Sequence, residues 1–411
     1  MRWWPLLAAG ILTACSVAPG DHDLTISASS VGAEGEILAR QLVAFERTTG
    51  IRVRIQQTPD DATQRHQLYV QWLNARIGTP DVLQLDIIWT PEFAAAGWIA
   101  PLSRFDVGDF APETIAANRW RGRMYAVPWF VDVGMLYRRT DVVAREPATL
   151  DELLARAEGR PDDIASGFVW QGARYEGVVT VYLEILTGHG GRILDEAGRP
   201  CLSSPSGIAA LEWLKRAIAG GGSPRAVVTW HEEETRFAFQ NGGAVFMRNW
   251  PYAVPLLDDS AKSKVASKFA VSPMPPVRQG LPSAATLGGA QLAINRWSPR
   301  QDQARELIAF LTAPEQMIDR AKATGQYPPR LSLYGSGDLD RALGTDSSTV
   351  RKIVESAVAR PSTPVYSEIS ELMQIELHRA LTGEIEAEEA LRRADHAIAA
   401  ILEGAGLGEV R

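Results

Sequence analysis

The sequence has little cysteine and no excess of basic residues. Its 411 residues include only two cysteines, so it is not a small scaffold held together by several disulfides. Lys and Arg number 42 against 49 Asp and Glu, and the formal net charge of −7 argues against nucleic acid or an anionic membrane surface as the main partner. The hydrophobic content of 45% is that of a globular protein long enough for two or three domains. We therefore expect a small-molecule ligand and no nucleic acid.

Sequence motifs for covalent chemistry and metal binding are also missing. The chain contains no P-loop, no nucleophile elbow and no Rossmann glycine fingerprint. Residues 231–235 (HEEET) begin like a zinc-protease helix, but Thr235 stands where the second histidine ligand belongs. Cys201 lies between Pro200 and a turn-like segment, with no motif that supports a nucleophile. We expect no catalytic residue, no metal and no cofactor, and hence no enzyme.

One enzyme class remains open as the alternative. A glycoside hydrolase needs only two carboxylates about 5–10 Å apart, and that requirement has no sequence motif. A carbohydrate-active enzyme that uses a carboxylate pair is therefore retained beside the binding function described below.

The N-terminus has the pattern of an export signal. Arg2 is followed by an apolar to weakly polar run at residues 3–14, which is too short to span a bilayer but suits a secretory signal. Residues 12–15 (LTAC) resemble the bacterial lipobox, in which the cysteine is acylated and becomes the new N-terminus. We predict a signal peptide at residues 1–14, lipidation of Cys15 and a tether at residues 15–23, on an exported periplasmic or extracytoplasmic protein. Cleavage after a small residue such as Ala18 is the alternative.

The mature chain begins with alternating strand and helix patterns. Residues 24–28, 51–55 and 82–88 have strand patterns, and residues 37–45 and 62–77 between them have apolar side chains at helical spacing. This β-α-β-α-β order predicts a parallel sheet covered by helices, and so an α/β fold. Ligands of such sheets bind beyond the carboxyl ends of the strands, which selects residues 29–36 and 86–89 as candidate site segments.

Further elements follow along the chain. Strand segments at residues 124–128 and 134–137 lie on either side of a proline-containing stretch, a plausible crossing between domains. Residues 208–219 form an amphipathic helix that places Trp213 in the core. The other predicted helices lie at 150–158, 303–311, 367–381 and 387–402, and the other predicted strands at 244–247 and 291–294.

Several segments, in order, resemble the extracellular sugar-binding proteins of ATP-driven importers. The first are residues 80–82 and 85–89, followed by Phe93 and residues 97–98. Closer resemblance to the trehalose/maltose-binding branch comes from residues 125–128 with 132–134, 168–172 with 175–177, 246–252 (FMRNWPY), 286–289 and 327–330. The shared order and spacing extend from residue 24 to the C-terminus. The resemblance implies a two-lobe periplasmic-binding-protein fold of type II, similar to maltose-binding protein, with lobes that hinge crossovers join.

The resemblance also implies a domain division and a function. Residues 24–130 and 288–330 would form the N-terminal lobe, and residues 131–287 and 331–411 the C-terminal lobe. A monomeric lipoprotein would capture an α-linked disaccharide, trehalose or maltose, and deliver it to the transmembrane permease subunits of an ABC importer. A sensor partner that works without an importer is a further alternative.

A disaccharide has hydroxyl rims and apolar C–H faces, so its site needs carboxylates, guanidinium groups and aromatic rings. Carried over position by position, the resemblance implies ligand contacts at Glu34, Arg65, Asp86, Phe130, Asp132, Trp250, Tyr252, Gly289 and Arg330. Further candidates are Trp89, Trp170, Glu232 and Glu233. Phe130 stands where some relatives carry Tyr, and Ala290 where some carry a stacking Trp, so the pocket is expected to be wider on that side.

Overall fold

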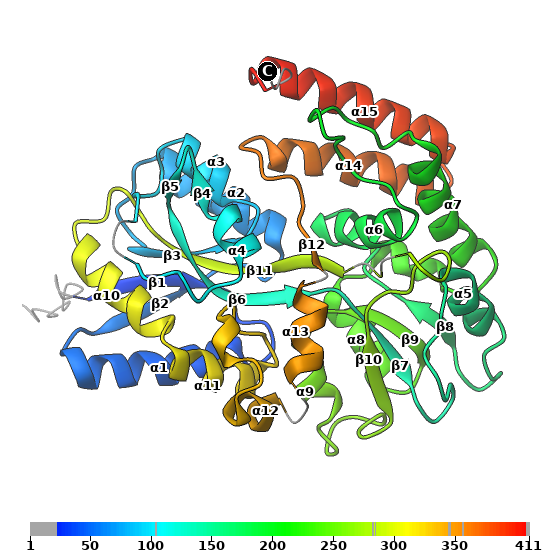
Figure 1. Ribbon diagram of the computed structural model, residues 1–411, viewed down its shortest axis with the longest axis horizontal. Coiled ribbons are helices and arrows are strands. Elements are labelled where there is room, and N and C mark those ends of the chain that lie inside the picture. Colours follow the sequence, from blue (N-terminus) through cyan, green and yellow to red (C-terminus); the bar gives the residue numbers. More distant parts are fainter. Residues whose placement is uncertain are drawn as a thin grey trace, which may run out of the picture.

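The described part of the chain folds around two larger sheets, each with its own helices, and a third sheet has only two short strands (Figure 1). The computed structural model describes residues 23–102, 105–281, 283, 285–343, 347–355 and 357–407. The predicted signal peptide at 1–14, Cys15 and the tether up to residue 22 lie outside these residues. None of the helices within the described part of the chain has the length and apolar character needed to cross a membrane.

The first sheet confirms the predicted β-α-β-α-β order. Strands β1 (Leu24–Ala28), β2 (Val53–Gln57) and β3 (Val82–Asp86) are parallel, with β1 between the other two. Helix α1 (Glu34–Thr49) and helix α2 (Ala62–Asn74) connect them. Helix α1 ends at Gly50, whose φ of 75° is the left-handed conformation that glycine adopts without strain.

Two antiparallel strands lead from the first sheet towards the second. Strand β11 (Ala285–Ile294) pairs with β3 and with β6 (Ala126–Val133), and the short β12 (Ala357–Val358) pairs with the start of β11. After Gly134 the chain continues as β7 (Met135–Arg139) in the second sheet. The order there is β10-β7-β9-β8, with β8 (Ser166–Val169), β9 (Ala244–Asn249) and β10 (Phe269–Ser272).

Helices cover the second sheet. They are α5 (Leu150–Glu158), α6 (Glu176–Gly188), α7 (Pro205–Ala219), α8 (Glu232–Gln240), α14 (Tyr366–Leu381) and α15 (Ala387–Gly404). All of them except α8 contribute to a second core. Trp213 on α7 is fully buried, which confirms its predicted place in the core. Helix α6 had no clear sequence pattern, because nearly all of its residues are buried and a helix that is apolar on every side lacks a 3.6-residue period.

The chain between residues 301 and 355 packs on the first sheet rather than on the second. It forms α10 (Gln301–Leu311), α11 (Pro314–Thr324), α12 (Gly337–Leu343) and α13 (Ser347–Glu355). Helix α12 contacts α11, and α13 contacts β6 and β11. This packing favours a lobe boundary near residue 358, later than the predicted boundary at residue 330.

Short elements complete the chain around both sheets. They are α3 (Thr90–Ala95), α4 (Pro112–Ala117), β4 (Arg119–Trp120), β5 (Arg123–Met124), α9 (Ala253–Leu257) and two 3-10 turns, Arg225–Thr229 and Leu331–Leu333.

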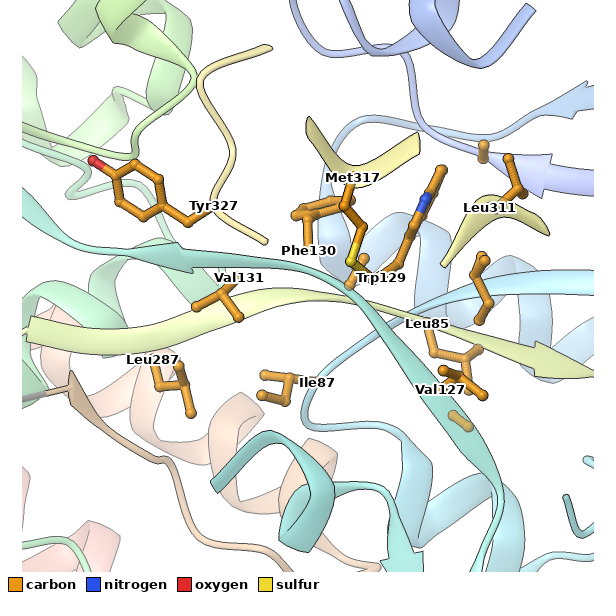
Figure 2. Close-up of a cluster of buried hydrophobic side chains, with 14 of the residues drawn as sticks. Leu85, Ile87, Val127, Trp129, Phe130, Val131, Leu287, Leu311, Met317 and Tyr327 are labelled. Carbon is orange, nitrogen blue, oxygen red and sulfur yellow. The ribbon is translucent and has the colours of Figure 1, made fainter. Parts of the chain in front are cut away.

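Strand β6 contains a bulge at Trp129. Phe130 pairs with Ala290 and Pro128 with Gln291, so Trp129 is the extra residue. Neighbouring side chains of a regular strand point to opposite faces, but a bulge changes their direction. As a result Trp129 and Phe130 both lie on the side of β6 that carries Met317 (Figure 2).

A buried ion pair lies where the strands pass between the sheets. Arg248 Nη2 is 2.5 Å from Glu184 Oε1, and both side chains are fully buried. The backbone N–H of Thr286, at the start of β11, donates to the same carboxylate at 3.2 Å. Gly134, between β6 and β7, packs so closely that an added Cβ would lie 1.8 Å from Glu184 Oε1. The β6–β7 and β10–β11 connections between the sheets therefore both pack on this ion pair.

We expect Glu184→Gln to lower the free energy of unfolding by about 3–5 kcal/mol, because it leaves Arg248 buried without a carboxylate. Chemical denaturation followed by circular dichroism measures this change. Glu196→Gln is the matched control, since its ion pair with Arg192 is exposed and is worth at most about 1 kcal/mol. Equal losses in the two variants would contradict the role given to the buried pair.

Candidate ligand-binding site

A cavity of about 450 Å³ lies between the two sheets. The first sheet contributes the segment after β1, the start of α2 and residues of β3, β6 and β11, and the second contributes the starts of α6 and α8 and the turn after β9. The two segments that the strand-end rule selected, 29–36 and 86–89, both reach the cavity. They do so through Ser29, Glu34 and Asp86. Of the predicted contacts, the lining includes Glu34, Arg65, Asp86, Phe130, Asp132, Trp250, Tyr252, Gly289, Glu232 and Glu233.

Glu34 is positioned by neighbours on both of its carboxylate oxygens. Ser29 donates its hydroxyl to Oε2 at 2.7 Å, and the Gln326 amide donates to Oε1 at 2.5 Å. Arg320 lies 3.6 Å from Oε1 and supplies a positive charge. The carboxylate is therefore fixed in direction and remains able to accept hydrogen bonds from the cavity side.

Arg65 reaches the cavity from the second turn of α2. Its Nη1 donates to the carbonyl oxygens of Pro59 and Asp60, at 2.8 and 3.1 Å, and its guanidinium lies over the Trp89 ring at 5.4 Å. Its Nε is buried without a hydrogen-bond partner among the described residues.

Asp86 is held by Arg360, which also reaches the second sheet's helices. Arg360 Nη2 is 3.2 Å from Asp86 Oδ1, and Arg360 Nη1 is 2.8 Å from Glu176 Oε1 at the start of α6. Tyr366 donates its hydroxyl to the same Glu176 oxygen at 2.8 Å. One guanidinium thus connects carboxylates from both sides of the cavity.

Asp132 lies near the end of β6, and one oxygen of its carboxyl group lacks a hydrogen-bond partner among the described residues. This oxygen, Oδ1, is buried. Burial, together with the negative charges of Glu34 and Asp86, raises the pKa of Asp132 from 3.8 to about 8. In the free protein this carboxyl therefore holds a proton at neutral pH.

Trp250 follows β9 and is fixed on several sides. Its Nε1–H donates to Glu232 Oε1 at 3.2 Å, and the guanidinium of Arg248 lies over its ring at 3.9 Å. The ring packs against Gly288, where an added Cβ would lie 3.2 Å from it. A ring held in this way is a rigid apolar surface for a ligand.

Tyr252 and Glu233 form a second fixed group on the same side. The Tyr252 hydroxyl donates to Glu233 Oε1 at 2.7 Å, and Arg236 Nε donates to the same oxygen at 2.8 Å. Burial alone would raise the pKa of Glu233, but the hydrogen bonds from Arg236 and Tyr252 hold it below its usual range. Burial and the Glu233 charge raise the pKa of Tyr252 well above its usual value, so its hydroxyl remains a donor.

Gly289 is required by the close approach of β6 and β11. Its φ is +114°, and an added Cβ would lie 2.3 Å from the carbonyl oxygen of Phe130. Phe130 and Ala290 are paired across these strands, and both line the cavity. The two positions at which the sequence departs from its relatives are therefore neighbours.

Three predicted contacts do not reach the cavity. Arg330 bonds the Thr312 carbonyl at 3.0 Å and pairs with Asp109 within the first sheet's packing. Trp89 is buried against Phe93 in the first core, and Trp170 is buried in the second core, where its Nε1–H donates to Ser223. Large aromatic rings in a core and an arginine paired with a local carboxylate both satisfy their own chemistry without a ligand.

The architecture and the sequence both match known proteins. The family model of the bacterial extracellular solute-binding proteins matches residues 41–342. The structure of maltose-bound MalE3 from T. maritima is 38% identical, with a TM-score of 0.88 over 92% of this chain and 100% of that one. A probable ABC transporter-binding protein of Deinococcus radiodurans is 31% identical over 91% of this chain and 92% of its own length. A Thermotoga lettingae solute-binding protein, bound with α-D-tagatose, is 26% identical with a TM-score of 0.84 over 92% and 99%.

The chain belongs to the bacterial extracellular solute-binding proteins.

Membership in this family confirms several expectations. The two-lobe α/β fold similar to maltose-binding protein is confirmed by the match to MalE3 over nearly the whole chain. The expectation of a binding protein rather than an enzyme is confirmed as well, because the family and these relatives are solute-binding proteins. As a member of an extracellular family, the protein is exported, and its place is periplasmic or extracytoplasmic.

Several cavity residues of this solute-binding protein had escaped the sequence analysis. They are Tyr175, Glu176, His231, Gln326 and Arg360, together with Gln84 and residues near the start of α2. Tyr175 and Glu176 lay inside a segment that resembled the sugar-binding family, so that segment was a usable signal. Arg360 lies between elements and next to Pro361, where neither periodicity nor a motif distinguishes it.

The raised pKa of Asp132 predicts a pH dependence of stability. The folded protein holds this proton up to about pH 8, whereas the unfolded chain loses it near pH 4, so Asp132 lowers stability as pH rises between these values. We expect the free energy of unfolding of Asp132→Asn, relative to the unmodified protein, to increase from about pH 4 to about pH 8. Urea denaturation at a series of pH values measures the difference.

Asp141→Asn is the control for this experiment. A hydrogen bond from Arg139 lowers the pKa of Asp141, so above about pH 5 both its folded and unfolded states have lost the proton. The stability difference for Asp141→Asn should then remain flat over the upper part of the range. A flat difference for Asp132→Asn as well would contradict the prediction.

Proposed function

We propose that this protein captures an α-linked disaccharide, trehalose or maltose, in the cavity and delivers it to the permease of an ABC importer. The observation that carries this proposal is a set of buried polar atoms that belong to side chains lining the cavity. Each lacks a hydrogen-bond partner among the described residues: Arg65 Nε, Asp132 Oδ1, Gln326 Oε1 and Arg360 Nε. Buried polar groups are normally paired, so unpaired donors and acceptors on side chains around one cavity favour a ligand rich in hydroxyl groups.

The aromatic rings supply the other half of the recognition. Phe130 comes from β6 of the first sheet, and Trp250 and Tyr252 follow β9 of the second. Flat apolar rings beside carboxylates suit the C–H faces and hydroxyl rims of a neutral sugar. Maltose in the T. maritima relative supports a disaccharide as the ligand.

Contacts between the two halves support a closing motion. Besides Arg360, Ser367 at the start of α14 donates its hydroxyl to Glu92 at 2.5 Å and lies 3.2 Å from His66 Nε2. His66 lies on α2 and Glu92 on α3, both on the side of the first sheet. A sugar that contacts both halves would favour this arrangement in proportion to its higher affinity for it.

A sugar titration tests the proposal. We expect the intrinsic tryptophan fluorescence to change with trehalose or maltose, and we expect Trp250→Ala to abolish binding or weaken it about a hundredfold or more, since stacking rings dominate such sites. Trp213→Ala is the matched control, because this ring lies in the second core, and it should lower thermal stability while leaving affinity unchanged.

Three outcomes would count against the proposal. The first is no fluorescence response to any disaccharide, and the second is an unchanged affinity in Trp250→Ala. The third is steady hydrolysis of a bound disaccharide, which would favour the carboxylate-pair enzyme instead. Genes for a permease pair beside this one would favour an importer over a sensor partner.

The lipid anchor and the monomeric state belong to the same proposal. We expect Cys15→Ser to move the protein from the membrane fraction to the soluble fraction, because two acyl signals give stable anchoring that a protein without them lacks. Fractionation of cells that express each form measures this. The released protein should elute as a monomer on size exclusion, and retention of Cys15→Ser in the membrane fraction would exclude anchoring through this residue.

A further inference from the structure

Arg320 of helix α11 is a buried arginine. It lies beside the cavity but is not one of the residues that line it. Only 1% of its surface is exposed, and it contacts two lining side chains, Phe130 and Glu34. None of its three side-chain nitrogens has a hydrogen-bond partner among the residues that the structure describes. A buried guanidinium with no acceptor loses the hydrogen bonds that water gave it, so other interactions have to compensate.

Two aromatic rings provide one of these interactions. The Arg320 Cζ lies 3.9 Å from the ring centre of Trp129 and 4.4 Å from that of Phe130. The two rings belong to consecutive residues, and the bulge in β6 allows both to reach the same guanidinium (Figure 2 shows the rings on one side of the strand). A cation is attracted to the face of each ring, so Arg320 restrains the orientation of Phe130.

Two carboxylates provide the other interaction. Arg320 Nη2 is 3.6 Å from Glu34 Oε1, which the Gln326 amide also holds. Burial lowers the pKa of Arg320 from 12.5 to about 10, while the charges of Glu34 and Asp132 oppose this shift. The guanidinium therefore stays charged at neutral pH, between ring faces and the acidic side of the cavity.

We propose that Arg320 is a positioning residue for ligand binding, which orients the Phe130 ring and compensates the negative charge of Glu34 and the charge that Asp132 acquires when its carboxyl ionises. The ligand then meets one fixed apolar surface and a fixed hydroxyl acceptor at Glu34, without contacting Arg320 itself. This inference rests on the proposed function, since it assumes that a sugar binds in the cavity.

Two substitutions separate the two parts of this role. Arg320→Lys keeps the charge but removes the planar group that contacts both rings, and we expect about tenfold weaker binding of maltose and trehalose. Arg320→Met removes the charge as well, and we expect a larger loss of affinity and a pH profile of binding that moves to higher pH. Met317→Ala, on the same helix and beside the same rings (Figure 2), is the matched control that alters packing alone. It should lower thermal stability without changing the affinity or its pH profile.

A measurement without sugar tests the charge compensation separately. Titration of the ¹³C-labelled carboxyl group of Asp132 in the free protein should give a higher midpoint in Arg320→Met than in the unmodified protein, because Arg320 lowers this pKa. The other charged groups that face Asp132 are Glu34 on α1, Asp86 on β3 and Arg248 on β9, and all remain in the variant. An unchanged midpoint would overturn the proposal even if no sugar binds.

A double-mutant cycle tests the connection to the ligand. In a Glu34→Gln background we expect Arg320→Lys to have a smaller effect on affinity than in the unmodified protein, because the two residues act together. The proposal is wrong if sugar binds and the Arg320 variants lose only stability, as Met317→Ala does. If the unmodified protein binds none of the sugars, the proposed function fails, and the Asp132 titration still decides whether Arg320 compensates its charge.

Discussion

The buried ion pair of Glu184 and Arg248 joins the second sheet to both strands that arrive from the first. Its carboxylate accepts the N–H of Thr286 and leaves no room for a side chain at Gly134, while its guanidinium lies against the Trp250 ring. Such a pair is costly to break because either partner alone would remain as a buried charge. The hinge, the second core and one aromatic surface of the cavity therefore share a single interaction.

Negative charges are also paired with arginines around the cavity. Carboxylates outnumber guanidinium groups on its lining, yet several of them are paired: Asp86 and Glu176 with Arg360, and Glu233 with Arg236. Acceptors that are fixed before the ligand arrives lose less entropy on binding, and they reject analogues that leave them unpaired. Asp132 is the exception, with one unpaired oxygen and a raised pKa, and a ligand hydroxyl could satisfy it.

Much of the fold could be predicted because its first elements are local patterns. Strands β1 and β3 and helices α1 and α2 each carry their own periodicity and stop signals, and the strand-end rule then led to Glu34 and Asp86. Helix α6 could not be found in this way, because its burial on nearly all sides removes the contrast between faces. The packing of helix α12 on α11 also depends on contacts that no local pattern indicates.

The sequence by itself determined the two-lobe α/β fold, the family and most of the residue types that surround the cavity. Only the tertiary structure decided which side chains of a given type reach it. Trp250 is held at the cavity by neighbours from the second sheet, whereas Trp89 and Trp170 are packed inside cores. Arg360 connects the two lobes because it pairs with Asp86 and Glu176, whereas Arg330 pairs with Asp109. The partners of an arginine depend on which carboxylates folding brings near it. Residue type follows from the sequence, but proximity between distant segments arises only when the sheets assemble.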